Sequence, residues 1–335
     1  MSDSSQPYAV LGAGSWGTAL ALQLARAGHT TLLWSHHATQ CEEIQRTRRN
    51  EHYLPGIVFP DTLQPTADLA DTIARVRDIL VVVPSHVFRE TVQKLKPYLG
   101  ERHRLAWGTK GLEQGSSKLL HQIVREELGI TVPIAAVSGP TFAMEVAQGH
   151  PGAITVASKN TEFADELANA LQSEYFLTYT SEDIIGVEIG GAVKNVMAIA
   201  AGIADGMGFG TNTRAALITR GLNEIMRLGV AMGGQRETFM GLSGMGDLVL
   251  TCSDDQSRNR RFGLALGRGM DVESAHNSIS QVVEGIGTAK SVYMLSQEHQ
   301  VNMPITEQVY KVIYEGRSPR KAVQILMNRT PHPEH

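Results

Sequence analysis

The chain has only two cysteines in 335 residues, Cys41 and Cys252, and they lie far apart in no CxxC or histidine-rich arrangement. A disulfide framework or a cysteine-ligated zinc site therefore has no support. Positive charge is not in excess either, because 30 Lys and Arg stand against 34 Asp and Glu for a formal net charge of −4. The chain as a whole offers no attraction to nucleic acid or to an anionic membrane.

Long uncharged hydrophobic runs are also absent. Residues 1–8 are polar and lack the basic and then apolar order of a secretory signal. The most hydrophobic helical candidate surrounds residues 193–204, but only ten uncharged residues separate Lys194 from Asp205, which is too few to span a bilayer. We therefore expect a cytoplasmic protein with no membrane insertion, no nucleic-acid partner and no metal site.

The composition that is present is globular, with 42% apolar and 19% charged residues, and the length suits two domains. In the first half, short apolar runs alternate with longer amphipathic segments, which is typical of βα units on a parallel sheet. Strands are expected at residues 8–11, 30–34, 79–83, 104–107, 134–137 and 153–157. Strand patterns stop near Thr180 and helix follows helix from Ile184, so we predict a sheet domain over 1–182 and a helical domain over 183–335.

The clearest motif is GxGxxG at residues 12–17, placed between the first expected strand and a helix. Gly12 permits a tight turn, Gly14 lets the backbone approach a pyrophosphate, and Gly17 allows close packing of the helix on the strand. The helix N-terminus then offers free N–H groups and a positive dipole end to phosphates. A tight turn without a ligand is the alternative, but the strand, the spacing and the helix agree, so the motif predicts a dinucleotide cradle.

The end of the second expected strand indicates which cofactor is accepted. NAD-selective sites carry Asp or Glu there to bind the ribose 2′-hydroxyl. This chain instead has Ser35, His36 and His37, with no acid before Glu42. His36 is either a contact for a 2′-phosphate or an ordinary surface histidine. The sequence permits both NADPH and NADH and argues against strict NAD specificity.

A lysine lies on an apolar helix in the second half. None of the residues three, four or seven positions from Lys194 is charged, so no carboxylate of its own helix pairs with it. A buried and unpaired lysine has a lowered pKa, which suits acid–base chemistry near neutral pH. The alternative is a lysine that extends its ammonium group to solvent from a core helix. The adjacent Asn195 and the motifs that follow favour the functional interpretation.

Two later segments carry polar groups that suit a phosphorylated substrate. Asp247 ends a glycine-rich loop, where it could orient a lysine, bind a substrate hydroxyl or cap a helix. Ser257, Arg258 and Asn259 combine a planar guanidinium with neutral donors, which fits a phosphate. A solvated helix start is the competing interpretation, and a nucleic-acid patch lacks the aromatic residues it would need. Cys252 has no histidine partner and is expected to be structural.

Two residues in the first half come directly after the carboxyl ends of expected strands. Open α/β sheets bind their ligands at that end of the strands. Lys110 comes just after the strand at residues 104–107. Thr141 comes after the strand at 134–137, where it could cap the next helix or contact substrate.

Eight motifs follow one another along the chain: GAGSWGTALA, VVVPSH, GTKGLE, SGPTFAMEV, GGAVKNVMAIAAGIADGMGFGTNTRAALITRG, GMGDLVLTC, QSRNRRFG and QVVEG. From about residue 8 to residue 326, this ordered set resembles the bacterial NAD(P)-dependent sn-glycerol-3-phosphate dehydrogenases. The resemblance implies an α/β, Rossmann-type N-terminal domain and an all-α C-terminal substrate domain, a 6-phosphogluconate-dehydrogenase-like fold. It also implies reversible reduction of dihydroxyacetone phosphate to sn-glycerol 3-phosphate for phospholipid biosynthesis.

The resemblance assigns roles to residues of this chain. It implies that Lys194 is the general acid and base. The implied substrate contacts are Lys110, Gly139, Thr141, Lys194, Asp247, Ser257, Arg258 and Asn259. The implied contacts of NADPH or NADH, beside the cradle glycines, are Ser15, Trp16, His36, Lys110, Ala143, Arg258, Val282 and Glu284.

Two other functions stay open on the residues alone. A related two-domain hydroxyacid dehydrogenase would use Arg258 for a carboxylate. A non-catalytic dinucleotide sensor would need the cradle but neither Lys194 nor the cluster at residues 257–259. A homodimer is compatible with the sequence, although no exposed apolar stripe indicates one.

Overall fold

The computed structural model describes residues 7–129 and 131–328. It forms two compact units, one of Met1–Glu113 with Lys118–Glu188 and one of Gln114–Ser117 with Ile189–His335. The expectation that residues 1–8 carry no secretory signal lies largely outside the described residues. The outer ends of the two predicted domains also lie outside them. We retain the boundary after residue 182 as a proposal, because it separates the last strand from the first helix of the helical half.

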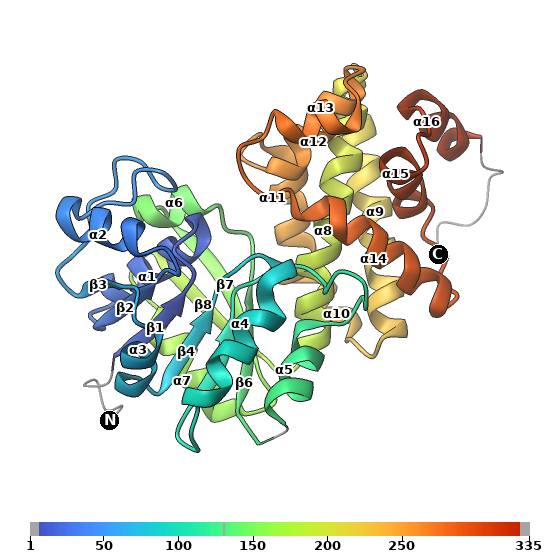
Figure 1. Cartoon of the computed structure of the whole chain (residues 1–335). Coiled ribbons are helices and arrows are strands. Elements are labelled where there is room, and N and C mark those ends of the chain that lie inside the picture. Colours follow the sequence, from blue (N-terminus) through green and yellow to red (C-terminus); the bar gives the residue numbers. More distant parts are fainter. Residues whose placement is uncertain (1–6, 130, 329–335) are drawn as a thin grey trace. The chain divides into compact units, whose positions relative to one another are not determined.

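The first unit is built on an eight-stranded sheet (Figure 1) with the order β3-β2-β1-β4-β5-β6-β7-β8. The strands are β1 (Tyr8–Leu11), β2 (Thr31–Trp34), β3 (Leu63–Thr66), β4 (Asp78–Val81), β5 (Arg104–Trp107), β6 (Ile134–Ser138), β7 (Gly152–Ala157) and β8 (Phe176–Ser181). Neighbouring strands are parallel except β6 and β7. The expectation of a wholly parallel sheet is therefore wrong for this pair of strands. The direction in which successive strands are added to the sheet reverses between β1 and β4.

Helices cover both faces of this sheet, which is why its short central strands are almost uninterruptedly apolar. One face packs against α1 (Ser15–Arg26), α6 (Ala143–Gln148) and α7 (Thr161–Leu171). The other face packs against α3 (Leu69–Arg75), α4 (Phe88–Leu95) and α5 (Leu120–Leu128). A further helix, α2 (Ala38–Thr47), follows β2. This arrangement confirms the α/β, Rossmann-type class.

The regular elements described in the second unit are all helices (Figure 1). Its helices are α8 (Ile184–Gly206), α9 (Thr211–Ala231), α10 (Arg236–Met240), α11 (Asp247–Ser253), α12 (Arg258–Gly267), α13 (Val272–Asn277), α14 (Glu284–Glu298), α15 (Pro304–Tyr314) and α16 (Pro319–Met327). The length and composition of α8 alone would suit a membrane span, but 94% of its apolar window is buried inside the protein. It is the core helix of this unit.

Glycines let α8 and α12 touch along their backbones. Gly202 and Gly206 lie four residues apart on α8, and Gly263 and Gly267 have the same spacing on α12. A Cβ atom at any of the four would overlap a backbone carbonyl oxygen of the facing helix. The contact brings the first turn of α12 close to the middle of α8, where Lys194 and the residues after it lie.

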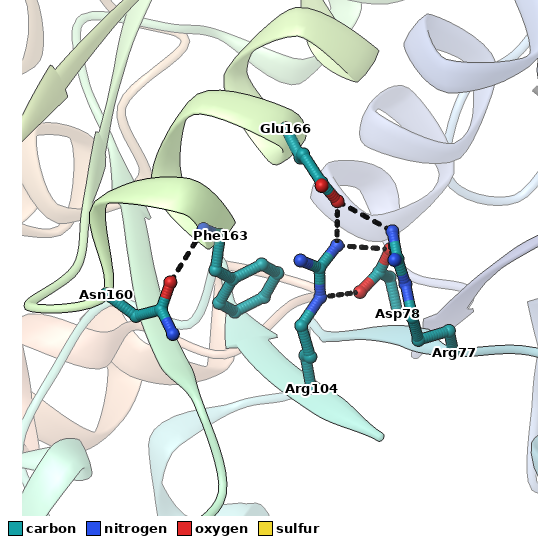
Figure 2. A network of polar contacts seen from close by, with 6 residues as sticks. All are labelled: Arg77, Asp78, Arg104, Asn160, Phe163 and Glu166. Carbon is teal, nitrogen blue, oxygen red and sulfur yellow. Dashed lines mark hydrogen bonds and ion pairs between the residues drawn. The ribbon is translucent and has the colours of Figure 1, made fainter. Parts of the chain in front are cut away.

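An ion-pair network joins the amino ends of β4 and β5 to α7 (Figure 2). Arg104 donates to Asp78 through Nε at 2.5 Å and Nη2 at 2.8 Å, and to Glu166 through Nη2 at 2.8 Å. Arg77 adds bonds to Asp78 at 3.2 Å and Glu166 at 2.7 Å. The Arg104 guanidinium also lies 4.4 Å from the Phe163 ring centroid. The network is balanced in charge and lies at the opposite end of these strands from the glycine cradle.

We expect Arg104→Met to lower the free energy of unfolding by about 3–5 kcal/mol, because it leaves the buried Asp78 carboxylate without its main partner. Urea denaturation measures this loss. Arg77→Met is the matched control, since its side chain is 38% exposed against 11% for Arg104, and we expect it to cost about 1 kcal/mol or less. Equal losses in the two variants would contradict this account.

A buried carboxylate holds the start of α15 in the second unit. Glu224 of α9 accepts hydrogen bonds from the backbone N–H groups of Ile305 at 2.6 Å and Thr306 at 3.1 Å, and from the Thr306 hydroxyl at 3.0 Å. These are N-terminal helix donors with no partner inside the helix. Burial nevertheless outweighs these bonds and raises the pKa of Glu224 from 4.5 to about 7.

The raised pKa makes a prediction about stability and pH. Because the native carboxyl group binds its proton more tightly than the unfolded one, its contribution is complete below about pH 4.5 and is lost as the pH rises through about 7. The loss is on the order of 3 kcal/mol. Thermal unfolding of the wild type and of Glu224→Gln should therefore differ in their pH slopes between about pH 5 and 8. Parallel profiles would show that Glu224 does not titrate in this range.

Candidate functional site

The glycine cradle lies at the point where the strand order reverses, after the carboxyl end of β1 and beside that of β4. Gly12 has a φ of +119°, which an L side chain rarely adopts, and a Cβ there would overlap the carbonyl oxygen of Val82. A Cβ on Gly17, in α1, would overlap the carbonyl oxygen of Gly12. Both positions therefore require glycine for the turn and for the packing of α1.

Gly14 is different, because no atom beyond its own chain neighbours lies within 4 Å of where its Cβ would be. It occupies the N-cap position of α1 in an extended conformation that any residue adopts. Nothing in the protein demands glycine there, whereas a phosphate approaching the open N-terminus of α1 would. The residues present thus fit a dinucleotide pyrophosphate.

Side chains from outside the motif, Asn50 and Gln40, and one from within it, Ser15, support this turn. Asn50 is buried and donates to the Ala13 carbonyl and to Thr18 Oγ1, both at 2.9 Å. Gln40 donates to the same Ala13 carbonyl at 2.9 Å. Ser15 Oγ donates to the Tyr53 carbonyl at 3.0 Å. Sequence reasoning missed Asn50 and Gln40, since a single Asn or Gln in a polar segment carries no motif.

The structure also describes the region after β2. His36 is exposed and its ring centroid lies 3.7 Å from that of His37. Partial desolvation lowers the pKa of His36, with further lowering by His37 and Lys94, and Glu90 opposes the shift. The neutral imidazole is therefore favoured near pH 7, so His36 offers a ligand a hydrogen bond rather than a full charge.

Several predicted residues of the first unit come together around the end of β5. Lys110 Nζ donates to the Gly139 carbonyl at 3.0 Å and lies 5.8 Å from the Trp16 ring centroid. Thr141 Oγ1 donates to the same carbonyl at 3.3 Å, and Ala143 begins α6 two residues later. Lys110, Trp16 and the segment at residues 139–143 therefore lie close together in the first unit.

In the second unit, Lys194 is only 7% exposed, so it does not extend to solvent. Its Nζ forms an ion pair with Asp247 Oδ1 and donates to Thr251 Oγ1 at 2.9 Å. The expectation of an unpaired lysine is therefore wrong. No carboxylate of its own helix pairs with Lys194, but one from α11 does, and that partner favours the ammonium form.

Asp247 is the first residue of α11 and is fully buried. The N-cap position belongs to Gly246, so the alternative that Asp247 caps a helix is wrong. Thr251, one helical turn later, also donates to the Asp247 backbone carbonyl at 2.6 Å. Sequence reasoning missed Thr251, although its spacing of four residues from an acid on a helix was a usable signal.

The cluster at the start of α12 is more buried than a solvated helix start would be. Ser257 caps α12, its Oγ accepting the N–H of Arg260 at 3.2 Å. Asn259 donates to Asn195 Oδ1 at 2.9 Å and accepts from the Gly285 N–H at 2.8 Å. Arg258 donates to the Val282 carbonyl at 3.1 Å, which places it beside the loop that leads to Glu284 at the start of α14.

The two cysteines have no catalytic partner. Cys252 is fully buried, and burial raises the pKa of its thiol to about 12. Burial also raises the pKa of Cys41. Neither thiol is activated, as expected for structural cysteines. Among the described residues, no group of three His, Cys, Asp or Glu side chains could hold a metal ion.

Comparison with known families covers nearly the whole chain. Residues 7–164 match the N-terminal domain, and residues 183–324 the C-terminal domain, of NAD-dependent glycerol-3-phosphate dehydrogenase. Two similar curated proteins are both named glycerol-3-phosphate dehydrogenase [NAD(P)+]. The one from Mannheimia succiniciproducens is 51% identical and the one from Pectobacterium atrosepticum 54% identical, each match covering 98% of both chains.

Solved structures agree with this result. Glycerol-3-phosphate dehydrogenase from Coxiella burnetii has a TM-score of 0.94 and 49% identity over 97% of this chain and 100% of that one. A ketopantoate reductase from Ralstonia eutropha, with a TM-score of 0.60 and 15% identity over 95% of this chain and 99% of that one, shares the fold alone. The chain belongs to the NAD-dependent glycerol-3-phosphate dehydrogenase family.

Proposed function

We infer that the protein is a glycerol-3-phosphate dehydrogenase that interconverts dihydroxyacetone phosphate and sn-glycerol 3-phosphate with NADPH or NADH. The observation that carries the mechanism is the buried Lys194, held by Asp247 and Thr251. A dinucleotide sensor would not need a buried ammonium group fixed by an acid and a hydroxyl. We propose that this group meets the substrate oxygen in the reaction.

The cofactor supplies hydride to the C2 carbonyl carbon when it is bound. Gly12, Gly14 and Gly17 would hold its pyrophosphate at the start of α1, with Ser15 and Trp16 beside it. The further cofactor contacts that we propose are His36, Lys110, Ala143, Arg258, Val282 and Glu284.

Lys194 acts as the proton donor in the reducing direction. Its ammonium group gives a proton to the C2 oxygen as that oxygen gains negative charge, and the neutral amine takes the proton back in the oxidising direction. Asp247 and Thr251 fix Nζ in one place, so little reorganisation is needed during the step. Lys110 is also proposed as a contact of the substrate oxygens.

Binding energy from the phosphate would orient the reacting carbon. Arg258 presents a planar donor fork, and the Ser257 hydroxyl keeps its hydrogen for the phosphate because its oxygen accepts from Arg260. Asn259 already donates one hydrogen bond through Nδ2 and accepts one through Oδ1. Its second Nδ2 hydrogen is the one that would serve substrate, while its other bonds hold α12 against α8.

The product is the backbone of glycerophospholipids, and we propose that the reaction takes place in the cytoplasm. A homodimer also remains a proposal. The absence of an acid after β2 and the neutral imidazole of His36 support acceptance of both reduced cofactors.

Initial rates of NADPH and NADH oxidation with dihydroxyacetone phosphate test the function, followed by absorbance at about 340 nm. We expect turnover with both cofactors and a far lower rate with small keto acids. Faster reduction of keto acids would favour the hydroxyacid dehydrogenase alternative. NADPH binding without oxidation by any of these carbonyls would favour the sensor.

A further inference from the structure

A buried arginine lies beside the proposed phosphate cluster without belonging to it. The Arg260 side chain is 8% exposed and binds three separate segments of the second unit. Its Nε donates to the Cys252 carbonyl in the last turn of α11 at 3.1 Å, and its Nη2 donates to Asp205 near the end of α8 at 2.5 Å. Its Nη1 forms an ion pair with Asp255 in the loop before α12.

These contacts link the three helices that carry the proposed chemistry. Lys194 lies on α8, Asp247 opens α11, and the phosphate cluster opens α12. Asp205 also accepts from Arg214 of α9 at 3.1 Å, so its position is fixed from two sides. The planar guanidinium donates in three fixed directions, which a flexible ammonium group does not do.

The backbone geometry makes this link short and stiff. A Cβ on Gly202 of α8 would overlap the carbonyl oxygen of Arg260 itself, so the two helices meet at this residue. The N–H of Arg260 binds Ser257 Oγ, and the neighbouring Asn259 binds Asn195, the residue after Lys194. The first turn of α12 is thus anchored to α8 through both residues.

We propose that Arg260, paired with Asp205, is a positioning residue that sets the phosphate-binding turn at residues 257–259 relative to the proton donor Lys194. The proposal rests on the function proposed above. It assigns Arg260 no contact with substrate. If this is so, the Arg260–Asp205 pair determines how accurately the bound phosphate orients the reacting carbon.

A purely structural role predicts something different. A loosened fold lowers the rate with every substrate in proportion to the folded fraction. A displaced phosphate-binding turn instead penalises only substrates that carry a phosphate. Dihydroxyacetone has the same carbonyl group without the phosphate, so the ratio of kcat/KM for the two substrates separates the two roles.

The test compares Arg260→Lys and Asp205→Asn with the wild type and with Arg268→Gln, an exposed arginine just after the same helix. For the two variants we expect kcat/KM for dihydroxyacetone phosphate to fall by about 30- to 100-fold, while that for dihydroxyacetone changes by less than about threefold. Inhibition by inorganic phosphate should weaken in parallel. Arg268→Gln should match the wild type in all three measurements.

Equal losses with both substrates, or unchanged inhibition by inorganic phosphate, would overturn the proposal. Failure of both variants to fold would show that the pair serves the fold and would overturn it too. A wild-type protein that does not reduce dihydroxyacetone phosphate would instead refute the proposed function, which keeps the two failures distinct.

Discussion

Replacing Lys194 with methionine should lower kcat for dihydroxyacetone phosphate by about 10⁴-fold, the upper end for loss of a general acid, with a change in the KM for NADPH below about threefold. Methionine is one atom shorter than lysine and similarly flexible, but it cannot donate a proton. The glycine cradle lies in the other unit and loses no contact. Steady-state kinetics with each substrate varied in turn measures both constants.

The control for this variant must deal with stability, because Lys194 is an ion-pair partner as well as a proton donor. Lys194→Met leaves the fully buried Asp247 carboxylate without its cation, at an expected cost of about 3–5 kcal/mol. The double variant Lys194→Met with Asp247→Asn should recover much of that stability and none of the turnover. A single variant with kcat within about tenfold of the wild type would refute the role of Lys194.

The sequence predicted the parts of the fold that depend on local pattern. The expected strands at residues 8–11 and 104–107 coincide with β1 and β5, because the last three residues of each are apolar and buried. It did not predict β3, which contains Pro65 and the exposed Gln64 at the edge of the sheet. It also did not predict β8, where Leu177 and Tyr179 are exposed, so that burial does not follow hydrophobicity.

The candidate site shows the same division between local and long-range information. Spacing on one helix correctly indicated that no carboxylate of α8 pairs with Lys194. It could not supply Asp247, which lies 53 positions later in the chain and reaches the lysine only through the packing of two helices. The contacts of Arg260 with Asp205 and Cys252 are of the same kind. Such partners are fixed by tertiary packing and leave no periodicity in the sequence.

Alanine at Gly14 should abolish efficient cofactor use without harming the fold. The N-cap conformation there suits alanine, and no protein atom beyond the two chain neighbours lies within 4 Å of the new methyl group. The free energy of unfolding should therefore change by less than about 1 kcal/mol. The methyl group would occupy the path by which a pyrophosphate approaches the N-terminus of α1, so the KM for NADPH should rise at least about 30-fold, equivalent to about 2 kcal/mol.

Gly17→Ala is the matched variant, with the same added methyl group and the opposite expectation. Its Cβ would overlap the Gly12 carbonyl oxygen, so α1 must move away from the sheet. We expect a loss of stability of more than about 3 kcal/mol from overpacking and backbone displacement. A glycine turn that served only the fold would make Gly14→Ala harmless to NADPH binding as well as to stability. A large rise in KM for a fully stable Gly14→Ala variant is the result that only a dinucleotide cradle explains.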